Sequence, residues 1–176
     1  HTRWATHGAV TVPNTHPHVS HDGKFVMVHN GVIENFGALK HFLTGKGIEF
    51  NSETDSEVLC NLIAYNYAEL LNEKDRLLDA VRIALAQCRG AYGIAVLCLD
   101  YLETMIGARR GSPLVVGLGD DANFIASDAS AFVGRAKEAV FLNDGELAIL
   151  KGTDFRITTL EGQEAKAVAH PVDQIS

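Results

Sequence analysis

The first eight residues, HTRWATHG, concentrate polar side chains that could hold a small charged ligand: Arg3, Thr6 and His7 surround Trp4. A guanidinium group is well shaped to bind a carboxylate through two parallel hydrogen bonds. The same residues also fit a purely structural interpretation, in which Arg3 forms a surface ion pair and Trp4 belongs to the core. From these residues alone, both interpretations stay open.

A second candidate is the sequence His29-Asn30-Gly31, which ends a predicted strand. A side-chain amide followed by a backbone N–H can direct two donors at one point, as an oxyanion hole requires. Such donors stabilise the negative charge that develops on a carbonyl oxygen in the transition state. Asn-Gly is also a common turn sequence, so the pattern is not specific by itself.

Asp55 is predicted to be the first residue of a helix that Thr54 caps. Glu57 follows three residues after Thr54, which is the spacing of a capping box. A carboxylate in the first turn is normally explained by the helix dipole. If the start of the helix faces a pocket, the same carboxylate could receive the ammonium group of a ligand.

No metal ligands or nucleophile can be identified from spacing. His16, His18 and His21 lie close together, but their spacing matches neither a helical H-x-x-x-H pair nor a Cys/His finger, so we predict polar support for a pocket and no metal. The chain also has no G-x-S-x-G sequence and no phosphate-binding glycine loop. The candidate residues therefore suit a zwitterion and an oxyanion but include no attacking group.

The three cysteines are predicted to be core residues. Cys60, Cys88 and Cys98 each lie in an apolar segment and show no C-x-x-C spacing. Free cysteines in such segments usually act as small apolar side chains. Their odd number and spacing fit a reducing cytoplasm better than a disulfide or zinc framework.

The candidate residues are expected to be positioned by one strand and several helices in the first half of the chain and by short strands in the second half. A strand is predicted at 24–31, a short helix within 35–47, an amphipathic helix after Thr54, and another helix from about 74 to 87. Mainly apolar runs of six to nine residues follow, and their short connections favour antiparallel pairing. These runs are 92–100, 104–110, 113–119, 123–128, 139–144, 146–151, 154–160 and 165–172. One short helix is expected within 128–138, and the sequences NDGE (143–146) and LEGQ (160–163) are typical of hairpin turns.

Length and charge limit the class of protein. The 176 residues suit one domain, 1–176, of helices followed by antiparallel strands. The chain has 22 acidic and 15 basic residues, a formal net charge of -7 and no basic cluster, which argues against a nucleic-acid partner. No apolar run is long enough to cross a membrane.

Several motifs together resemble one known family. They are HTRWATHG, NTHPHVS, VHNGVIEN, SETDSEV, CRGAYG, GSPLVVGLG and FIASD. In this order and approximate spacing they are similar to the glutaminase domains of glucosamine 6-phosphate synthases, the isomerizing glutamine:fructose-6-phosphate aminotransferases. These domains are class II glutamine amidotransferases with an N-terminal-nucleophile fold. The resemblance implies an α+β, four-layer αββα sandwich with two antiparallel sheets, incomplete at its N-terminus in this chain.

The resemblance assigns roles to the opening motif. It implies that Arg3 binds the α-carboxylate of glutamine, with Thr6 and His7 lining the same end of the site. Trp4 matches a mobile ring that helps to gate the passage of ammonia. These are expectations for substrate-binding residues.

It assigns roles further along the chain as well. Asp55 matches the acceptor for the α-ammonium group, and Asn30 and Gly31 match the oxyanion hole through a side-chain amide and a backbone N–H. His16 and His29 lie in family motifs, and we assign them only pocket support.

The implied reaction is one of amino-sugar (hexosamine) biosynthesis in the cytoplasm. Glutamine is hydrolysed through a γ-glutamyl thioester, and the ammonia is passed to fructose 6-phosphate in an isomerase domain. The family's nucleophile is an N-terminal cysteine, which this sequence lacks, so we expect this chain alone to be inactive and the isomerase domain to be absent from it. The resemblance implies no cofactor, and the parent enzyme is expected to be a homo-oligomer.

Two other interpretations remain. One is the glutaminase domain of an amidophosphoribosyltransferase, which the residues of the motif HTRWATHG disfavour. The other is a non-catalytic module that binds glutamine through Arg3 and Asp55 without hydrolysing it.

Overall fold

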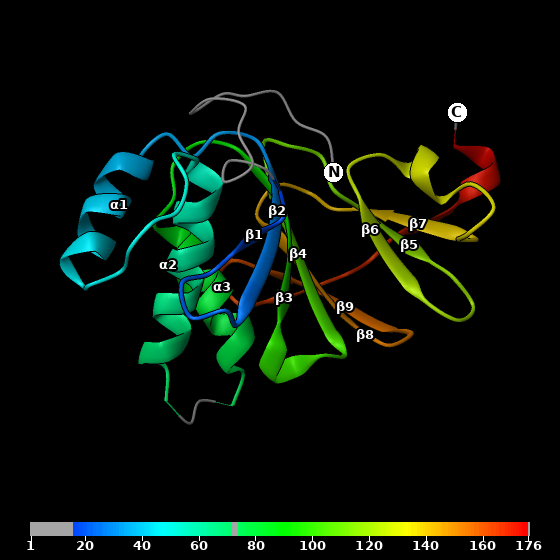
Figure 1. The fold of residues 1–176 in the computed structure, drawn as a ribbon. Helices are drawn as coiled ribbons and strands as arrows, with labels where there is room; N and C mark the ends of the chain where they lie inside the picture. The colour runs from blue at the N-terminus through cyan, green and yellow to red at the C-terminus, as the bar shows by residue number, and fades with distance from the viewer. Residues whose placement is uncertain (1–15, 72–73, 176) are drawn as a thin grey trace.

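Two antiparallel β-sheets packed face to face form the centre of the molecule (Figure 1). The computed structural model describes residues 16–71 and 74–175. The larger sheet has the order β1-β2-β3-β4-β8-β9-β10, and the smaller sheet has the order β11-β7-β5-β6. Every pair of neighbouring strands in the two sheets is antiparallel, which confirms the expectation from the short connections.

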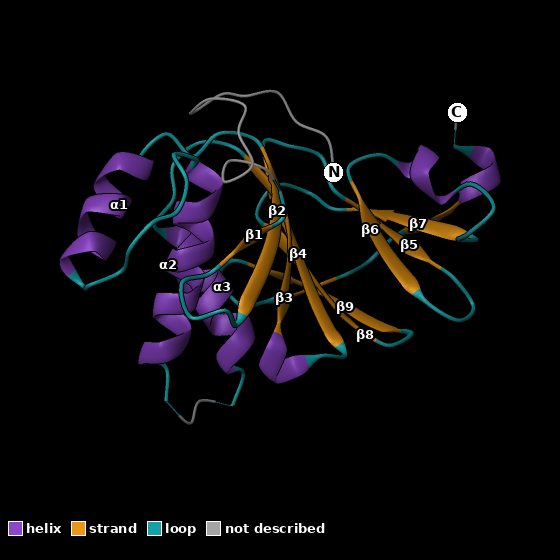
Figure 2. Ribbon diagram, viewed as in Figure 1, coloured by secondary structure: helices purple, strands orange, loops and turns teal. Residues whose placement is uncertain are grey.

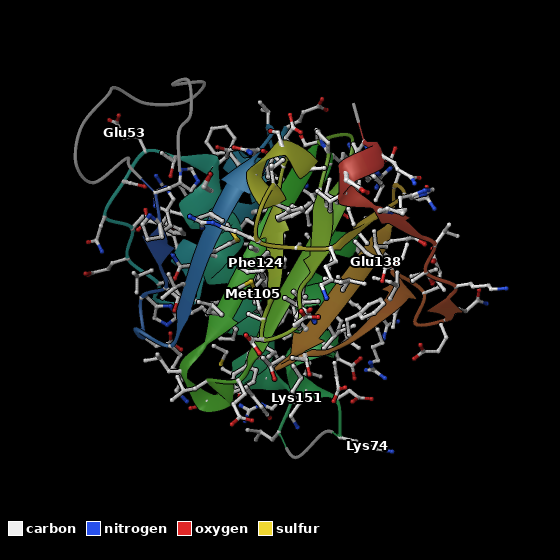
Figure 3. The ribbon with its side chains drawn as sticks, turned by 90° about the vertical axis from the view of Figure 1, so that its right-hand side faces the viewer. Glu53, Lys74, Met105, Phe124, Glu138 and Lys151 are labelled. Atoms are coloured by element: carbon white, nitrogen blue, oxygen red, sulfur yellow. The ribbon has the colours of Figure 1, made fainter. Side chains whose placement is uncertain are left out.

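The strands of the larger sheet are β1 (His18–Val19), β2 (Phe25–Asn30), β3 (Tyr92–Cys98), β4 (Thr104–Arg110), β8 (Glu146–Lys151), β9 (Asp154–Thr159) and β10 (Glu164–Ala165). Those of the smaller sheet are β5 (Val115–Leu118), β6 (Asn123–Ala126), β7 (Glu138–Phe141) and β11 (Ala169–Pro171). Apolar side chains from both sheets meet between them and form a shared core; they include Leu114, Val116, Val140, Leu150 and Ile157. In Figure 3 the smaller sheet faces the viewer; Met105 of β4 belongs to the core between the sheets, whereas Phe124 of β6 packs with Phe132 on the outer face.

Three helices cover the outer face of the larger sheet (Figure 2). They are α1 (Phe36–Gly45), α2 (Asp55–Glu69) and α3 (Arg76–Ala86). Helical spacing predicts apolar faces for α2 and α3, and the side chains it assigns to the interior are buried with one exception, Leu70, which is half-buried and directly follows α2. The buried ones are Leu59, Leu62 and Ile63 of α2 and Leu77, Leu78, Val81 and Leu85 of α3.

The outer face of the smaller sheet carries two short 3₁₀ helices, η3 (Ala129–Phe132) and η4 (Val172–Gln174). Phe132 and Val172 pack with Val115 and Ala139 of the sheet beneath them. The order of layers is therefore helices, sheet, sheet and short 3₁₀ helices. This order confirms the expected α+β sandwich, with a thin fourth layer in the part of the chain that the structure describes.

Three local expectations need correction or refinement. LEGQ does join a hairpin, β9 to β10, but NDGE joins β7 to β8, which lie in different sheets, so it is not a hairpin turn. The helix expected in 128–138 is a single 3₁₀ turn, since the chain then turns through Gly134 at φ 79° and enters β7. The apolar run 165–172 divides between the end of β10 and β11, one in each sheet.

All three cysteines are buried, as predicted from their apolar surroundings. No helix among the described residues combines the length and the hydropathy that crossing a membrane would need.

Candidate functional site

The end of strand β2 approaches a neighbouring loop very closely. Asn30 pairs with Gly93 at the end of the β2–β3 ladder, and Gly31 follows with φ 114°. A Cβ atom at Gly31 would lie 2.3 Å from the carbonyl oxygen of Ala91 and 2.9 Å from Oγ of Ser112. Glycine is required here both for the backbone conformation and for the contact.

The two faces of β2 have different surroundings. Phe25 and Met27 lie in the core beneath the helices, and His29 continues this buried alternation. Asn30 lines a cavity of about 450 Å³ together with residues of both sheets, including Ala95 and Ile125. The predicted amide donor is thus placed at the rim of a largely apolar space between the sheets.

Asp55 is the first residue of α2, as predicted, and only 1% of its surface is exposed. Its Oδ2 accepts a hydrogen bond of 2.8 Å from the backbone N–H of Ile33. This bond joins the start of α2 to the segment that follows Asn30-Gly31. The start of a helix is also where its dipole favours an acidic side chain.

The turn before α2 is held by Glu57 and Thr54. Thr54 caps the helix through a bond of 3.3 Å from the Glu57 N–H, which confirms the first half of the predicted capping box. The second half is wrong: the Glu57 carboxylate accepts bonds from the backbone N–H groups of Asn51 and Ser52 and from the Ser52 hydroxyl. Thr54 Oγ1 also lies 3.1 Å from Nε2 of His18. This network fixes the turn that delivers Asp55.

The structure brings three of the predicted site residues, Asn30, Gly31 and Asp55, to one end of the sandwich through the bond from Ile33. Figure 3 shows Glu53, just before α2, at the opposite end of the molecule from Lys74 and Lys151. The other predicted site residues lie outside the described residues; they are Arg3, Trp4, Thr6 and His7.

Sequence reasoning gave too little weight to His29 and missed Ser56 and Ser112. His29 Nδ1 lies 2.9 Å from Oγ of Ser56, and its Nε2 lies 3.4 Å from the carbonyl oxygen of Ala91. Ser112 flanks Gly31. The sequence did show Ser112 as a small polar residue within the GSPLVVGLG motif. Its neighbour Gly31, however, is 81 positions earlier in the sequence.

The three thiols of the sequence are poorly suited to attack a substrate. Burial raises the pKa of Cys60 and Cys98 above the usual range and raises the pKa of Cys88 to about 12. The thiolate is the reactive form, so each cysteine is almost entirely in its unreactive form near neutral pH.

Histidine and acidic side chains do not assemble into an evident metal centre in the part of the chain that the structure describes, where no group of three or more His, Cys, Asp or Glu could hold an ion. The rings of His16 and His18 instead meet edge to face, with centroids 4.7 Å apart.

Taken together, the geometry offers two complementary subsites. The Asp55 carboxylate suits a ligand ammonium group, and the Asn30-Gly31 segment suits an oxygen that gains negative charge. The hydrogen bond from the Ile33 N–H joins one subsite to the other. An amino acid with a carbonyl group in its side chain would satisfy both.

Comparisons with known proteins also indicate a site for an amino acid with a carbonyl group in its side chain. A family model described as a glutamine amidotransferase domain matches residues 1–134. The glutamine–fructose-6-phosphate aminotransferase (isomerizing) of Thermus thermophilus is 45% identical over 173 residues, which are 98% of this chain and 28% of that protein. The enzyme of the same name from Methanosarcina acetivorans is 46% identical over 168 residues, covering 93% of this chain and 27% of its own length. The chain thus spans little more than a quarter of these relatives.

Solved structures agree on the fold. A glutamine phosphoribosylpyrophosphate amidotransferase from B. subtilis superimposes with a TM-score of 0.69 at 27% identity, covering 91% of this chain and 34% of that one. A glutamine aminotransferase class-II domain protein from Silicibacter pomeroyi has a TM-score of 0.55 at 18% identity, covering 85% of this chain and 71% of that one, and supports the fold alone.

Proposed function

The chain belongs to the glutamine amidotransferase domain family, and from this premise we propose that residues 1–176 form the glutaminase part of an enzyme that makes glucosamine 6-phosphate. The observation that carries the proposal is the Asp55 carboxylate, buried and hydrogen-bonded to the segment that follows Asn30-Gly31. The relatives that are 43–46% identical, all named glutamine–fructose-6-phosphate aminotransferase, support fructose 6-phosphate as the acceptor.

In the proposed mechanism, glutamine is bound at both ends of its zwitterion. Asp55 receives the α-ammonium group, and Arg3 binds the α-carboxylate with help from Thr6 and His7. Fixing these two charges orients the side-chain amide toward the nucleophile, which makes the attack nearly unimolecular. Trp4 is proposed to gate the ammonia that leaves.

The chemical step then depends on the oxyanion hole. A thiol outside the set Cys60, Cys88 and Cys98 attacks the amide carbon, and Asn30 and the Gly31 N–H stabilise the resulting oxyanion. Collapse of this intermediate, with a proton transferred to nitrogen, breaks the C–N bond and releases ammonia, leaving a γ-glutamyl thioester. Water hydrolyses the thioester to glutamate and restores the thiol.

We further propose that the fructose 6-phosphate site belongs to a separate isomerase domain and that the enzyme works in the cytoplasm as a homo-oligomer. A nucleic-acid or membrane partner is not part of this proposal. The closest rival acceptor is phosphoribosyl pyrophosphate, since structural relatives that use it share 27% identity with this chain.

The test is glutamate release by the full-length gene product with fructose 6-phosphate, and separately with phosphoribosyl pyrophosphate. We expect only fructose 6-phosphate to stimulate release and to accept ¹⁵N from amide-labelled glutamine. Asp55→Asn should raise the KM for glutamine at least tenfold, because the hydrogen bond from Ile33 survives while the charge is lost. Asn30→Ala should lower kcat about a hundredfold or more, by loss of one oxyanion donor.

Asp121→Asn is the matched control, because Asp121 is exposed in the turn between β5 and β6 and does not line the cavity beside Asn30. Its kinetic constants should equal those of the wild type. Stimulation by phosphoribosyl pyrophosphate alone would replace the proposed acceptor, and glutamine binding without hydrolysis in the full-length protein would favour a sensor.

We also propose that the 176-residue chain by itself does not hydrolyse glutamine, because its three thiols are buried and protonated. Ammonia release should equal the buffer background. Release above background that Asn30→Ala abolishes would contradict this statement.

A further inference from the structure

His29 lies between the two halves of the site described above. It is the fifth residue of β2, and only 3% of its surface is exposed. The next residue, Asn30, turns to the opposite face of the strand and lines the cavity between the sheets. His29 also lines this cavity, but Nδ1 of its imidazole contacts Ser56, so the ring reaches the start of α2.

One contact of the ring reaches the half of the site that contains Asp55. Nδ1 of His29 lies 2.9 Å from the hydroxyl oxygen of Ser56, which is 2% exposed and directly follows Asp55 in α2. Either atom can be the donor. This contact fixes the first turn of α2 relative to strand β2.

The other contact reaches the half that contains Gly31. Nε2 of His29 lies 3.4 Å from the carbonyl oxygen of Ala91, and because a carbonyl oxygen only accepts, this pairing requires the tautomer with a proton on Nε2. The same oxygen packs against Gly31 so closely that an added Cβ would lie 2.3 Å away. The backbone N–H of Ala91 also donates to the carbonyl of Val32. The position of the Ala91 peptide therefore governs the orientation of the Gly31 backbone.

We propose that His29 is a positioning residue that sets the ammonium acceptor Asp55 and the oxyanion donor Gly31 in register, through its separate contacts with Ser56 and Ala91. Its role is positional, because both of these contacts are made to other residues of the chain. The inference rests on the proposed glutaminase function, because it specifies how that site is held for catalysis. The contact of Nδ1 with Ser56 should then affect the KM for glutamine, and the contact of Nε2 with Ala91 should affect kcat.

Two replacements separate the contacts. The amide of Asn lies near the position of Nδ1 and can still pair with Ser56, whereas the amide nitrogen of Gln lies near Nε2 and can still donate to Ala91. His29→Asn should therefore disturb the oxyanion donor and lower kcat by roughly tenfold to a hundredfold, with KM for glutamine within about threefold. His29→Gln should disturb Asp55 and raise KM about tenfold, with kcat nearly unchanged.

Ser56→Ala provides an independent variant in case the histidine replacements do not fold. It removes only the hydroxyl that Nδ1 contacts, and it should reproduce the KM effect of His29→Gln. Thermal unfolding of each variant establishes the folded fraction, and the kinetic constants are expressed per folded enzyme. Kinetics are measured on the full-length gene product.

Amide hydrogen exchange gives a readout that does not need activity. The Ile33 amide, bonded to Asp55, should exchange faster in His29→Gln, and the Ala91 amide should exchange faster in His29→Asn. Equal changes in both variants, or kinetic constants that match the wild type, would overturn the role of His29. A wild type that releases no glutamate would instead overturn the proposed function and leave the exchange experiment to decide the inference.

Discussion

At Gly31 a side chain has no accessible space. The backbone has φ 114°, and the atoms nearest to an added Cβ belong to the Ala91 peptide, which cannot rotate away as a flexible side chain could. Gly31→Ala should therefore lower the free energy of unfolding by at least about 2 kcal/mol and reduce glutamine hydrolysis more than a hundredfold. Urea unfolding and glutamate release measure the two effects.

Gly23→Ala is the matched control for this prediction. Gly23 also has a positive φ, 74°, but no atom lies within 4 Å of an added Cβ. It should cost only about 1 kcal/mol and leave hydrolysis unchanged. Equal losses in the two variants would show that the close contact with Ala91 is unimportant.

Residue type alone did not identify the site, because Asn-Gly is a common turn and a carboxylate is common at the start of a helix. The resemblance gave Asn30, Gly31 and Asp55 their expected roles, which stay predictions, and the structure brings the three residues to one end of the sandwich. His29 was different, because its contacts lie 27 and 62 positions away in the sequence. Spacing along the chain contains no such information.

At the scale of elements, the start of α2 depends on Glu57. Its buried carboxylate accepts from two backbone N–H groups and from the Ser52 hydroxyl. In Glu57→Gln, an NH₂ group replaces one of the two acceptor oxygens and faces donors, so we expect a loss of about 1–3 kcal/mol in the free energy of unfolding. Urea unfolding checks this value, and Glu49→Gln, on an exposed side chain, should change it by less than about 0.5 kcal/mol. A Glu57→Gln protein as stable as the wild type would show that the turn does not need the carboxylate.

Local patterns identified most elements but not how they join. The cap at Thr54, the buried faces of α2 and α3 and the strand segments all follow from nearest neighbours in sequence. NDGE shows the limit: its composition predicts a turn, yet the following strand pairs with β4 in the larger sheet. Asp144 holds that connection through Arg109 and the Gly111 N–H, contacts that only the folded chain reveals.

At the scale of the whole molecule, burial protects all three thiols from reagents. Cys60, Cys88 and Cys98 lie in the core between the larger sheet and the helices. A thiol reagent such as DTNB should react with none of them within minutes in the native protein and with three after denaturation. One rapidly reacting thiol in the folded chain would contradict the burial on which the proposed inactivity of this chain depends.

The same burial makes the molecule less stable in base. Burial raises the pKa of each thiol in the folded state, to about 12 for Cys88, whereas an unfolded cysteine has a pKa near 8.5. Above about pH 8.5 the unfolded chain therefore binds fewer protons than the native one, and the free energy of unfolding falls as pH rises. The expected slope is roughly 1 kcal/mol per pH unit for Cys88. Tyr92, whose pKa burial raises to about 12, adds to the slope above about pH 10.

Urea unfolding at a series of pH values between about 7 and about 10.5 measures this slope. Replacing Cys88 by Ala removes one titrating group, so the variant should be less stable at pH 7 yet lose stability more slowly in base. The curves for wild type and variant should therefore converge as the pH rises, which a simple packing defect would not produce because its cost is independent of pH. Parallel curves would mean that the Cys88 thiol titrates alike in the folded and unfolded chains.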